Sequence, residues 1–211
     1  MNATTLVLVR HGETAWNVET RIQGHLDIPL NETGRAQARE LGKRLRTMRF
    51  DAVYSSDLAR AWETARPGFD DADARIAREP RLRERHLGAL QGLTGEEALV
   101  VQPQAWKVFK AREADAPLAG GESLRVFADR ILAFLNEALK RHPGQTILCV
   151  THGGALDAAH RHATGMALDA KRDFPIYNAS VNTITCKGDR WTIDRWGDIS
   201  HLPADLAMDD A

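Results

Sequence analysis

The chain contains little cysteine and no long hydrophobic run. Two cysteines among 211 residues are too few for a disulfide framework, which favours a reducing compartment. The apolar stretch near the N-terminus is too short for the core of a signal peptide. No run approaches the roughly 20 apolar residues of a membrane span. We therefore expect a cytoplasmic protein without membrane contact.

The chain also lacks an excess of either positive or negative charge. The 28 basic and 29 acidic residues leave a formal net charge of −1, so nothing indicates a nucleic-acid partner, and any affinity for anions must come from local clusters. A hydrophobic fraction of 43% and a charged fraction of 27% are typical of a globular protein. Internal repeats and low-complexity linkers are absent. We expect residues 1–211 to form a single domain.

Two short apolar runs each end in a His-Gly step. Residues 6–9 lead into Arg10-His11-Gly12, and residues 147–150 lead into Thr151-His152-Gly153-Gly154. Continuous aliphatic runs of this length are typical of strands buried on both faces of a parallel sheet. Ligands bind beyond the carboxyl ends of such strands. The pattern predicts that both imidazoles project over one sheet edge.

The rest of the chain alternates between helical and strand patterns. Capping residues at 31–34 begin an amphipathic helix, and a strand at 52–56 is followed by a helix that Asp57 can cap. A strong amphipathic helix begins at Leu124, and the last two strands form a hairpin around residues 187–189. The stretch 94–113 is helical with a break at Pro103 and interrupts this rhythm. The order predicts an α/β fold, a three-layer α/β/α sandwich with a mostly parallel sheet and a small helical insertion.

Several cationic and donor side chains would meet at the predicted sheet edge. Arg10 and His11 follow one strand, His152 follows another, and Arg60 lies in the first turn of a helix. Arginine presents a planar fork that suits phosphate oxygens, and a helix N-terminus favours anions. Glu84, after a further predicted strand, is the best placed carboxylate. Each residue taken alone is more often structural, but the repeated His-Gly pattern favours a site.

A metal centre is the competing chemistry. His11, His152 and Glu84 are plausible ligand types for a divalent cation. Two guanidinium groups in the same pocket would repel that cation. We therefore expect no metal. Cys149, inside an apolar run, is expected to be an inert core residue rather than a nucleophile.

Many short motifs in the chain share one resemblance, which spans residues 4–201. Together they resemble the signature of the histidine phosphatase superfamily, in the branch that contains cofactor-dependent phosphoglycerate mutases and related phosphatases. The motifs are Arg10-His11-Gly12-Glu13-Thr14, Trp16-Asn17, Arg21-Ile22-Gln23-Gly24, Tyr54-Ser55-Ser56-Asp57-Leu58-Ala59-Arg60, Leu82-Arg83-Glu84, Gly121-Glu122-Ser123 and Thr151-His152-Gly153-Gly154.

The resemblance implies a role for each matching residue. His11 would be the nucleophile and Glu84 the general acid, with Arg10, Arg60 and His152 around the transferred phosphoryl group. The resulting phosphohistidine would be hydrolysed by water. The two arginines should lower the pKa of His11 and keep it nucleophilic. Further substrate-binding candidates are Asn17, Gln23, Gly24, Gly153 and, from the ending at 197–202, His201.

The resemblance leaves phosphatase and mutase as alternatives. Glu84-Arg85-His86 looks like the mutase loop, but Leu87 stands where mutases have tyrosine, and their paired arginines are missing. Lys107, Lys110 and Arg112 could substitute for that pair or form a solvated helix face. Residues 21–27 and 120–123 look like the loops of the phosphatases.

We favour a phosphatase that acts on a small phosphorylated metabolite without a cofactor. The alternative is a phosphoglycerate mutase that requires 2,3-bisphosphoglycerate. A non-catalytic domain that binds a phosphorylated ligand is a third option, which the intact set of His11, Glu84 and His152 disfavours. The oligomeric state is left open, with a homodimer as one option.

Overall fold

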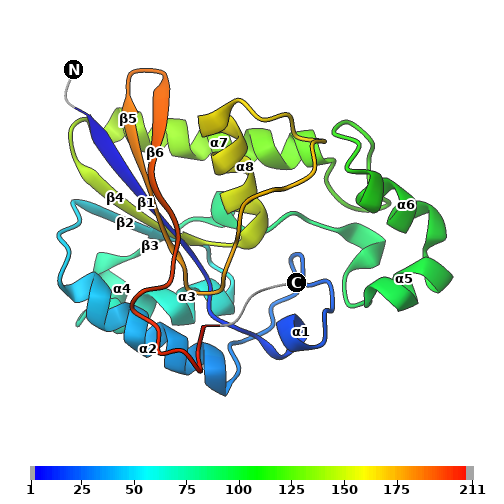
Figure 1. Ribbon diagram of the computed structural model, residues 1–211, viewed down its shortest axis with the longest axis horizontal. Helices are drawn as coiled ribbons and strands as arrows, with labels where there is room; N and C mark the ends of the chain where they lie inside the picture. The colour runs from blue at the N-terminus through cyan, green and yellow to red at the C-terminus, as the bar shows by residue number, and fades with distance from the viewer. Residues whose placement is uncertain (1–2, 208–211) are drawn as a thin grey trace.

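The computed structural model describes residues 3–207, which are built around a six-stranded sheet (Figure 1). The spatial order of the strands is β3-β2-β4-β1-β5-β6. The first four of these run parallel to one another, whereas β5 and β6 form an antiparallel hairpin at one edge. The strands are β1 (Thr4–Arg10), β2 (Ala52–Ser55), β3 (Ala77–Arg78), β4 (Thr146–Thr151), β5 (Val181–Lys187) and β6 (Arg190–Asp198).

Helices cover both faces of the sheet, which confirms the predicted three-layer fold (Figure 1). The α-helices are α1 (Ala15–Val18), α2 (Glu32–Arg46), α3 (Ala59–Ala65), α4 (Ala72–Arg75), α5 (Gly95–Val101), α6 (Pro103–Ala111), α7 (Leu124–Arg141) and α8 (Gly153–Thr164). The 3₁₀ turns within residues 3–207 are η1 (Arg66–Gly68), η2 (Pro80–Leu82) and η3 (Gly88–Leu90).

The alternation of side chains along the central strands builds two cores. Leu6 and Leu8 of β1 pack with α7 and α8, whereas Val7 and Val9 of the same strand pack with α2 and α3. Successive residues of a strand point to opposite faces, so a strand that is covered on both sides must be apolar throughout. This requirement explains the unbroken aliphatic runs before both His-Gly steps.

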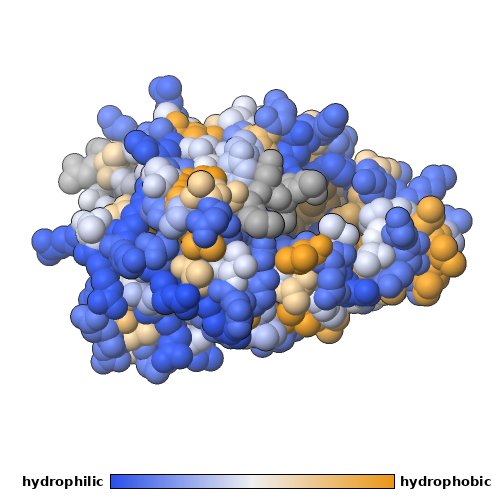
Figure 2. All heavy atoms as spheres, turned by 60° about the horizontal axis from the view of Figure 1, so that its bottom comes forward, coloured by the Kyte–Doolittle hydropathy of each residue, from blue (hydrophilic) through white to orange (hydrophobic). Residues whose placement is uncertain are grey.

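The inserted helices α5 and α6 carry a small core of their own. Leu90, Ala98 and Leu118 are buried together, with Trp106 and Phe109 packed against them. The helical insertion is where the sequence predicts it, and α6 starts at the expected break. Leu99, Val100 and Val101 of α5 are exposed, and Figure 2 shows hydrophobic atoms at the end of the molecule that this insertion forms. No helix within residues 3–207 combines the length and apolarity needed to cross a membrane.

Two local expectations are wrong. Asp57 does not cap α3, because its carboxylate binds Arg83, and the first N–H of the helix, on Ala59, donates to Asp27 Oδ1 at 2.7 Å instead. Glu84 does not directly follow the predicted strand, which is β3. The short strand β3 ends at Arg78, and η2 then leads into an irregular loop that carries Glu84. A charged pair and a proline-led turn have overridden the local propensities.

The core predicts the cost of truncating a central side chain. Phe134 of α7 is fully buried and lies edge-on to Tyr54, with ring centroids 5.2 Å apart. We expect Phe134→Ala to lower the free energy of unfolding by about 3–5 kcal/mol in urea titrations, because it leaves a cavity. Val126→Ala, on the exposed side of the same helix, should change it by less than about 0.5 kcal/mol. Equal effects of the two substitutions would contradict the assigned packing.

Candidate active site

The ends of β1 and β4 bring two histidines together. The strands pair in parallel with Arg10 opposite Thr151, so His11 and His152 both follow at the same edge of the sheet. Their ring centroids lie 5.2 Å apart in an edge-on arrangement, and both side chains are buried. The structure thus places the two imidazoles together, as the paired motifs predict.

The hydrogen bond of His11 determines which ring nitrogen is free. Nδ1 lies 2.7 Å from the carbonyl oxygen of Gly12. A carbonyl only accepts, so Nδ1 must carry the proton, and in the neutral ring Nε2 keeps its lone pair. The backbone of His11 is also fixed, because its carbonyl accepts from Asn178 Nδ2 at 2.9 Å. The ring of His11 is therefore held in one orientation, with the lone pair on Nε2.

Both ring nitrogens of His152 have partners within the protein. Arg60 Nε donates to Nδ1 at 3.2 Å, so Nδ1 bears the lone pair and the proton resides on Nε2. Nε2 donates to Ser56 Oγ at 2.8 Å. In this structure His152 therefore orients Arg60 and contacts His11 with its ring.

The Arg60 side chain is buried and links the site to the loop after α1. Its two terminal nitrogens donate to the carbonyl oxygens of Leu26 and Gly24, at 2.9 and 2.8 Å. Burial lowers its pKa to about 10, still high enough to keep the guanidinium charged near neutral pH. Within residues 3–207 this charge is bound by neutral carbonyl and imidazole groups rather than by a carboxylate.

Arg10, the last residue of β1, packs its side chain against the start of α8. Its side chain is 6% exposed and donates to the Ile176 carbonyl at 2.6 Å. A Cβ added to Gly153 would lie 3.4 Å from Arg10 Nε, so the guanidinium packs against the first turn of that helix. Arg10 and Arg60 both lower the pKa of His11 through their charge.

Burial is nevertheless the leading cause of the low histidine pKa values. The pKa of His11 lies well below 6.5 because desolvation disfavours the imidazolium, and the charges of Arg60 and Arg10 add to this effect. His152 has a lowered pKa for the same reasons. The sequence predicts the direction for His11 from the arginines, whereas the structure adds the larger contribution of burial. Both rings are neutral near pH 7.

The Glu84 carboxylate is held by two backbone N–H groups. Oε2 accepts from Gly154 N at 2.9 Å, in the first turn of α8, and Oε1 accepts from Arg85 N at 2.8 Å. A Cβ on Gly154 would collide with Glu84 Oε1 and approach Phe127 Cε1 at 3.1 Å. A side chain at this second glycine of the motif would therefore displace the Glu84 carboxylate.

A cavity of about 200 Å³ lies beside this carboxylate. Its walls come from α8, the insertion, α7 and the loop that carries Glu84. The lining residues are Glu84, Arg85, Leu87, Phe109, Arg112, Leu124, Phe127, Gly153, Gly154, Asp157 and Arg172. The cavity joins apolar side chains to three arginines, which is typical of a site for a small, charged ligand.

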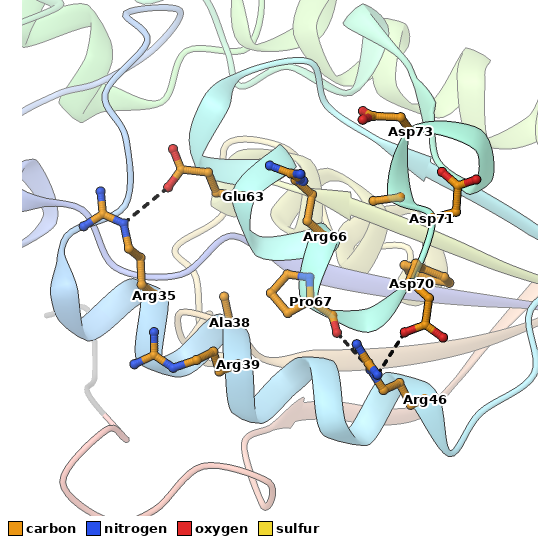
Figure 3. A pocket seen from close by; sticks show the side chains of 12 residues that line it. Arg35, Ala38, Arg39, Arg46, Glu63, Arg66, Pro67, Asp70, Asp71 and Asp73 are labelled. Carbon is orange, nitrogen blue, oxygen red and sulfur yellow. Dashed lines mark hydrogen bonds and ion pairs between the residues drawn. The ribbon is translucent and has the colours of Figure 1, made fainter.

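A hollow of about 590 Å³ lies elsewhere, between α2, α3 and α4 (Figure 3). Its charges are partly neutralised by ion pairs, between Arg35 and Glu63 at 3.7 Å and between Arg46 and Asp70 at 3.1 Å. It contains none of the predicted site residues. We therefore place the candidate site at the smaller cavity, whose lining includes Glu84 and Gly153, the glycine against which Arg10 packs.

The residues of this site match a known family. A model of the histidine phosphatase superfamily (branch 1) matches residues 6–199. The chain belongs to this superfamily. It is 43% identical over 201 residues to Phosphoglycerate mutase-like protein 4 of Arabidopsis thaliana, which covers 93% of this chain and 86% of that protein.

Two further similarities include a phosphatase and a solved structure. The chain is 41% identical over 202 residues to the Metal-independent phosphoserine phosphatase of Arabidopsis thaliana, over 94% of this chain and 83% of that protein. The solved structure of Bacillus stearothermophilus YhfR superposes with a TM-score of 0.83 at 38% identity, over 94% of this chain and 98% of that one. In the described part of this histidine phosphatase, no three His, Cys, Asp or Glu side chains are grouped to hold a metal ion.

The structure of this histidine phosphatase brings only some of the further substrate-binding candidates to the site. Gly24 reaches the site through its carbonyl on Arg60. Asn17 Oδ1 accepts from the backbone of Thr14 at 3.0 Å, so this amide caps α1, while the buried Oε1 of Gln23 has no hydrogen-bond partner among residues 3–207. Nδ1 of His201 lies 3.1 Å from a terminal nitrogen of Arg44, in the last turn of α2. These contacts do not bring His201 to the clustered side chains.

Sequence reasoning missed several residues that support the site. Ser56 and Asn178 bind His152 and His11, and Thr64 Oγ1 accepts from Gly12 N at 2.9 Å. Small polar residues of this kind are common in any chain, so nothing in their spacing marks them. The one signal for Ser56 was its place in the Tyr54–Arg60 motif, at the end of a predicted strand.

The close approach of Glu84 to α8 yields a first prediction for the site. Gly154→Ala should lower catalytic activity by roughly 100-fold, because the new Cβ displaces the carboxylate by a fraction of an ångström or more. Gly153→Ala should lose much less, since its Cβ meets Arg10 Nε at an ordinary 3.4 Å. Steady-state rates and melting temperatures of both variants would check this. A larger loss for Gly153→Ala would contradict the geometry.

The buried neutral histidines predict a pH-dependent stability. In the unfolded chain His11 and His152 titrate near 6.5, whereas their pKa values are lower in the folded protein. Below about pH 6.5 the unfolded chain binds more protons, so stability is complete above this pH and falls below it, by up to about 1.4 kcal/mol per pH unit for each histidine. Urea titrations at several pH values should show a smaller fall for His152→Asn than for wild type. An unchanged fall would contradict the assignment, and His162→Asn, at an exposed position of α8, is the control.

Proposed function

We propose that the protein hydrolyses a small phosphomonoester through a phosphohistidine formed on His11. The observation that carries the proposal is the state of His11: a buried neutral ring, oriented by Gly12, with Nε2 free and two arginines nearby. Membership of the histidine phosphatase superfamily supports the same chemistry. A non-catalytic binding domain would need neither this oriented nucleophile nor a carboxylate at the start of α8.

The reaction takes place in two transfers. His11 Nε2 attacks phosphorus, the N–P bond forms, and the ester P–O bond breaks while Glu84 gives its proton to the departing oxygen. Water then attacks the phosphohistidine and gives a proton to Glu84 as the N–P bond breaks. Glu84 thus acts first as acid and then as base, and both His11 and Glu84 return to their starting states.

Cations and helix ends stabilise the transferred group in this proposal. Arg10 and Arg60 provide guanidinium forks for its oxygens, and α8 directs its N-terminus toward the same edge. His152 holds Arg60 through Nδ1. A direct contact of His152 with phosphate would require Nε2 to exchange its bond to Ser56.

The cavity beside Glu84 suggests the class of leaving group. About 200 Å³ accommodates a small metabolite portion, and Arg85 and Arg172 favour an anionic one. Of the basic residues weighed as carboxylate binders, Arg112 lines the cavity, where it is bound to Asp157 at 2.9 Å. Lys110 instead lies over the Trp106 ring at 5.5 Å. We propose a phosphorylated small acid, which agrees with the phosphoserine phosphatase among the relatives.

A phosphoglycerate mutase is the second candidate, because several relatives carry that name. A mutase must protect its phosphohistidine from water, whereas a phosphatase must let water reach it. The same experiment separates the two activities.

A cytoplasmic location is part of the proposal. Cys149 and Cys186 are both free and buried, and burial raises the pKa of Cys186 to about 12. Unpaired, unreactive thiols are consistent with a reducing compartment.

The test uses purified wild type and His11→Asn. Wild type should release phosphate from small phosphorylated acids, and ³²P-labelled substrate should leave an acid-labile label on the protein. His11→Asn should lose roughly 1,000-fold or more of the activity and all of the label, since the nucleophile is gone. His162→Asn, outside the site, should retain both.

A second arm follows the interconversion of 2- and 3-phosphoglycerate with and without 2,3-bisphosphoglycerate. Fast interconversion with little phosphate release would favour the mutase. Full activity of His11→Asn in both arms would refute a phosphohistidine mechanism.

A further inference from the structure

One arginine holds the irregular loop that carries Glu84. Arg130, in α7, donates to the backbone carbonyls of Arg81, in η2, and of Arg83 and Glu84, in this loop, at 2.7, 3.0 and 3.1 Å. Residues 83–87 lie between η2 and η3 and have no regular secondary structure. Their carbonyls therefore depend on partners outside the segment, and Arg130 is the shared one.

Glu122 fixes Arg130 in turn. Its two oxygens accept from Arg130 Nε and from a terminal nitrogen, both at 2.8 Å, and Oε2 also accepts from His86 N at 2.8 Å. With these bonds the guanidinium directs hydrogen bonds from all three of its nitrogens into the loop or into Glu122. Both side chains are about four-fifths buried, so the bidentate pair is well shielded and geometrically specific. The pair ties both sides of the Glu84 loop to the start of α7.

The peptide group between Glu84 and Arg85 transmits this constraint to the carboxylate. Its carbonyl accepts from Arg130 at 3.1 Å and from His25 Nε2 at 2.7 Å, and its N–H donates to Glu84 Oε1 at 2.8 Å. A trans peptide is planar, so its C=O and N–H point in opposite directions and turn together. Hydrogen bonds that fix the Glu84 carbonyl therefore also fix the Arg85 N–H, which orients the Glu84 carboxylate.

We propose that Arg130, held by Glu122, is a positioning residue for Glu84, and that it acts through the orientation of the Glu84–Arg85 peptide. This inference rests on the proposed function, in which Glu84 protonates the leaving group. His25 holds the same carbonyl from the loop after α1. Arg130 itself is not among the residues that line the cavity, and none of its described contacts is to the histidine pair.

The test uses the dependence of the rate on the leaving group. A general acid is needed to expel an alkoxide, whereas p-nitrophenolate departs with little help. Values of kcat/KM for an alkyl phosphate and for p-nitrophenyl phosphate report the steps up to formation of the phosphohistidine. A general loss of folding or binding lowers both values together, but a misplaced acid lowers the alkyl value selectively.

Glu84→Gln provides the reference. It should lose roughly 100-fold or more on the alkyl phosphate and far less on p-nitrophenyl phosphate. Arg130→Lys keeps the charge but not the fork, and should show the same selectivity at about 10-fold on the alkyl ester. Arg141→Lys, at the other end of α7 and paired with Glu137, should leave both values unchanged.

The outcomes separate the two claims. If Glu84→Gln is selective and Arg130→Lys lowers both substrates equally, or neither, the positioning role is refuted and the proposed function stands. If Glu84→Gln shows no selectivity, the assignment of the general acid fails, and the positioning role with it. Should Arg130→Lys not fold, as circular dichroism would show, His25→Leu tests the same carbonyl: a selective loss supports the inference and an equal loss refutes it.

Discussion

The parallel pairing of β1 with β4 is the constraint on which the rest of the structure depends. It sets Arg10 opposite Thr151 and so delivers His11 and His152 to one edge in a fixed register. A slip by one residue would turn each apolar side chain toward the wrong core. The packing of two hydrophobic layers thus fixes the relative position of two catalytic candidates, whose own side chains contribute little to the choice of register.

The buried guanidinium of Arg60 keeps its positive charge uncompensated by a hydrogen-bonded carboxylate. Arg60 is fully enclosed, yet its bonds go to carbonyl oxygens and to an imidazole. Neutral acceptors satisfy the hydrogen-bonding requirement of a guanidinium without cancelling its charge. The Arg130–Glu122 pair is the opposite case, in which the charges compensate each other and the guanidinium also binds loop carbonyls. The site therefore separates arginines available to an anion from arginines that build its walls.

The sequence predicted those elements that depend on neighbouring residues or on a clear periodicity of apolar side chains. The apolar runs, the capped α2 and α7, and the helical insertion are in place, because each depends on local capping or on alternation that the chain shows directly. The Glu84 loop and the start of α3 were not predictable, since they depend on Arg130 and Asp27 from distant segments. The same holds for Ser56 and Asn178, whose partners are far away in the sequence. Gly154 is intermediate: the motif includes it, but only the approach of Glu84 explains it.

The bond between His11 Nδ1 and the Gly12 carbonyl has a consequence for the lifetime of the intermediate. In the resting protein a neutral ring donates this bond. In the proposed mechanism Nε2 then carries a phosphoryl group, the ring gains positive character, and a charge-assisted bond to the same carbonyl is roughly twice as strong. In that mechanism the contact that orients the ring also slows the departure of the phosphoryl group. The proposed rate of turnover would therefore depend on a single backbone oxygen next to the histidine.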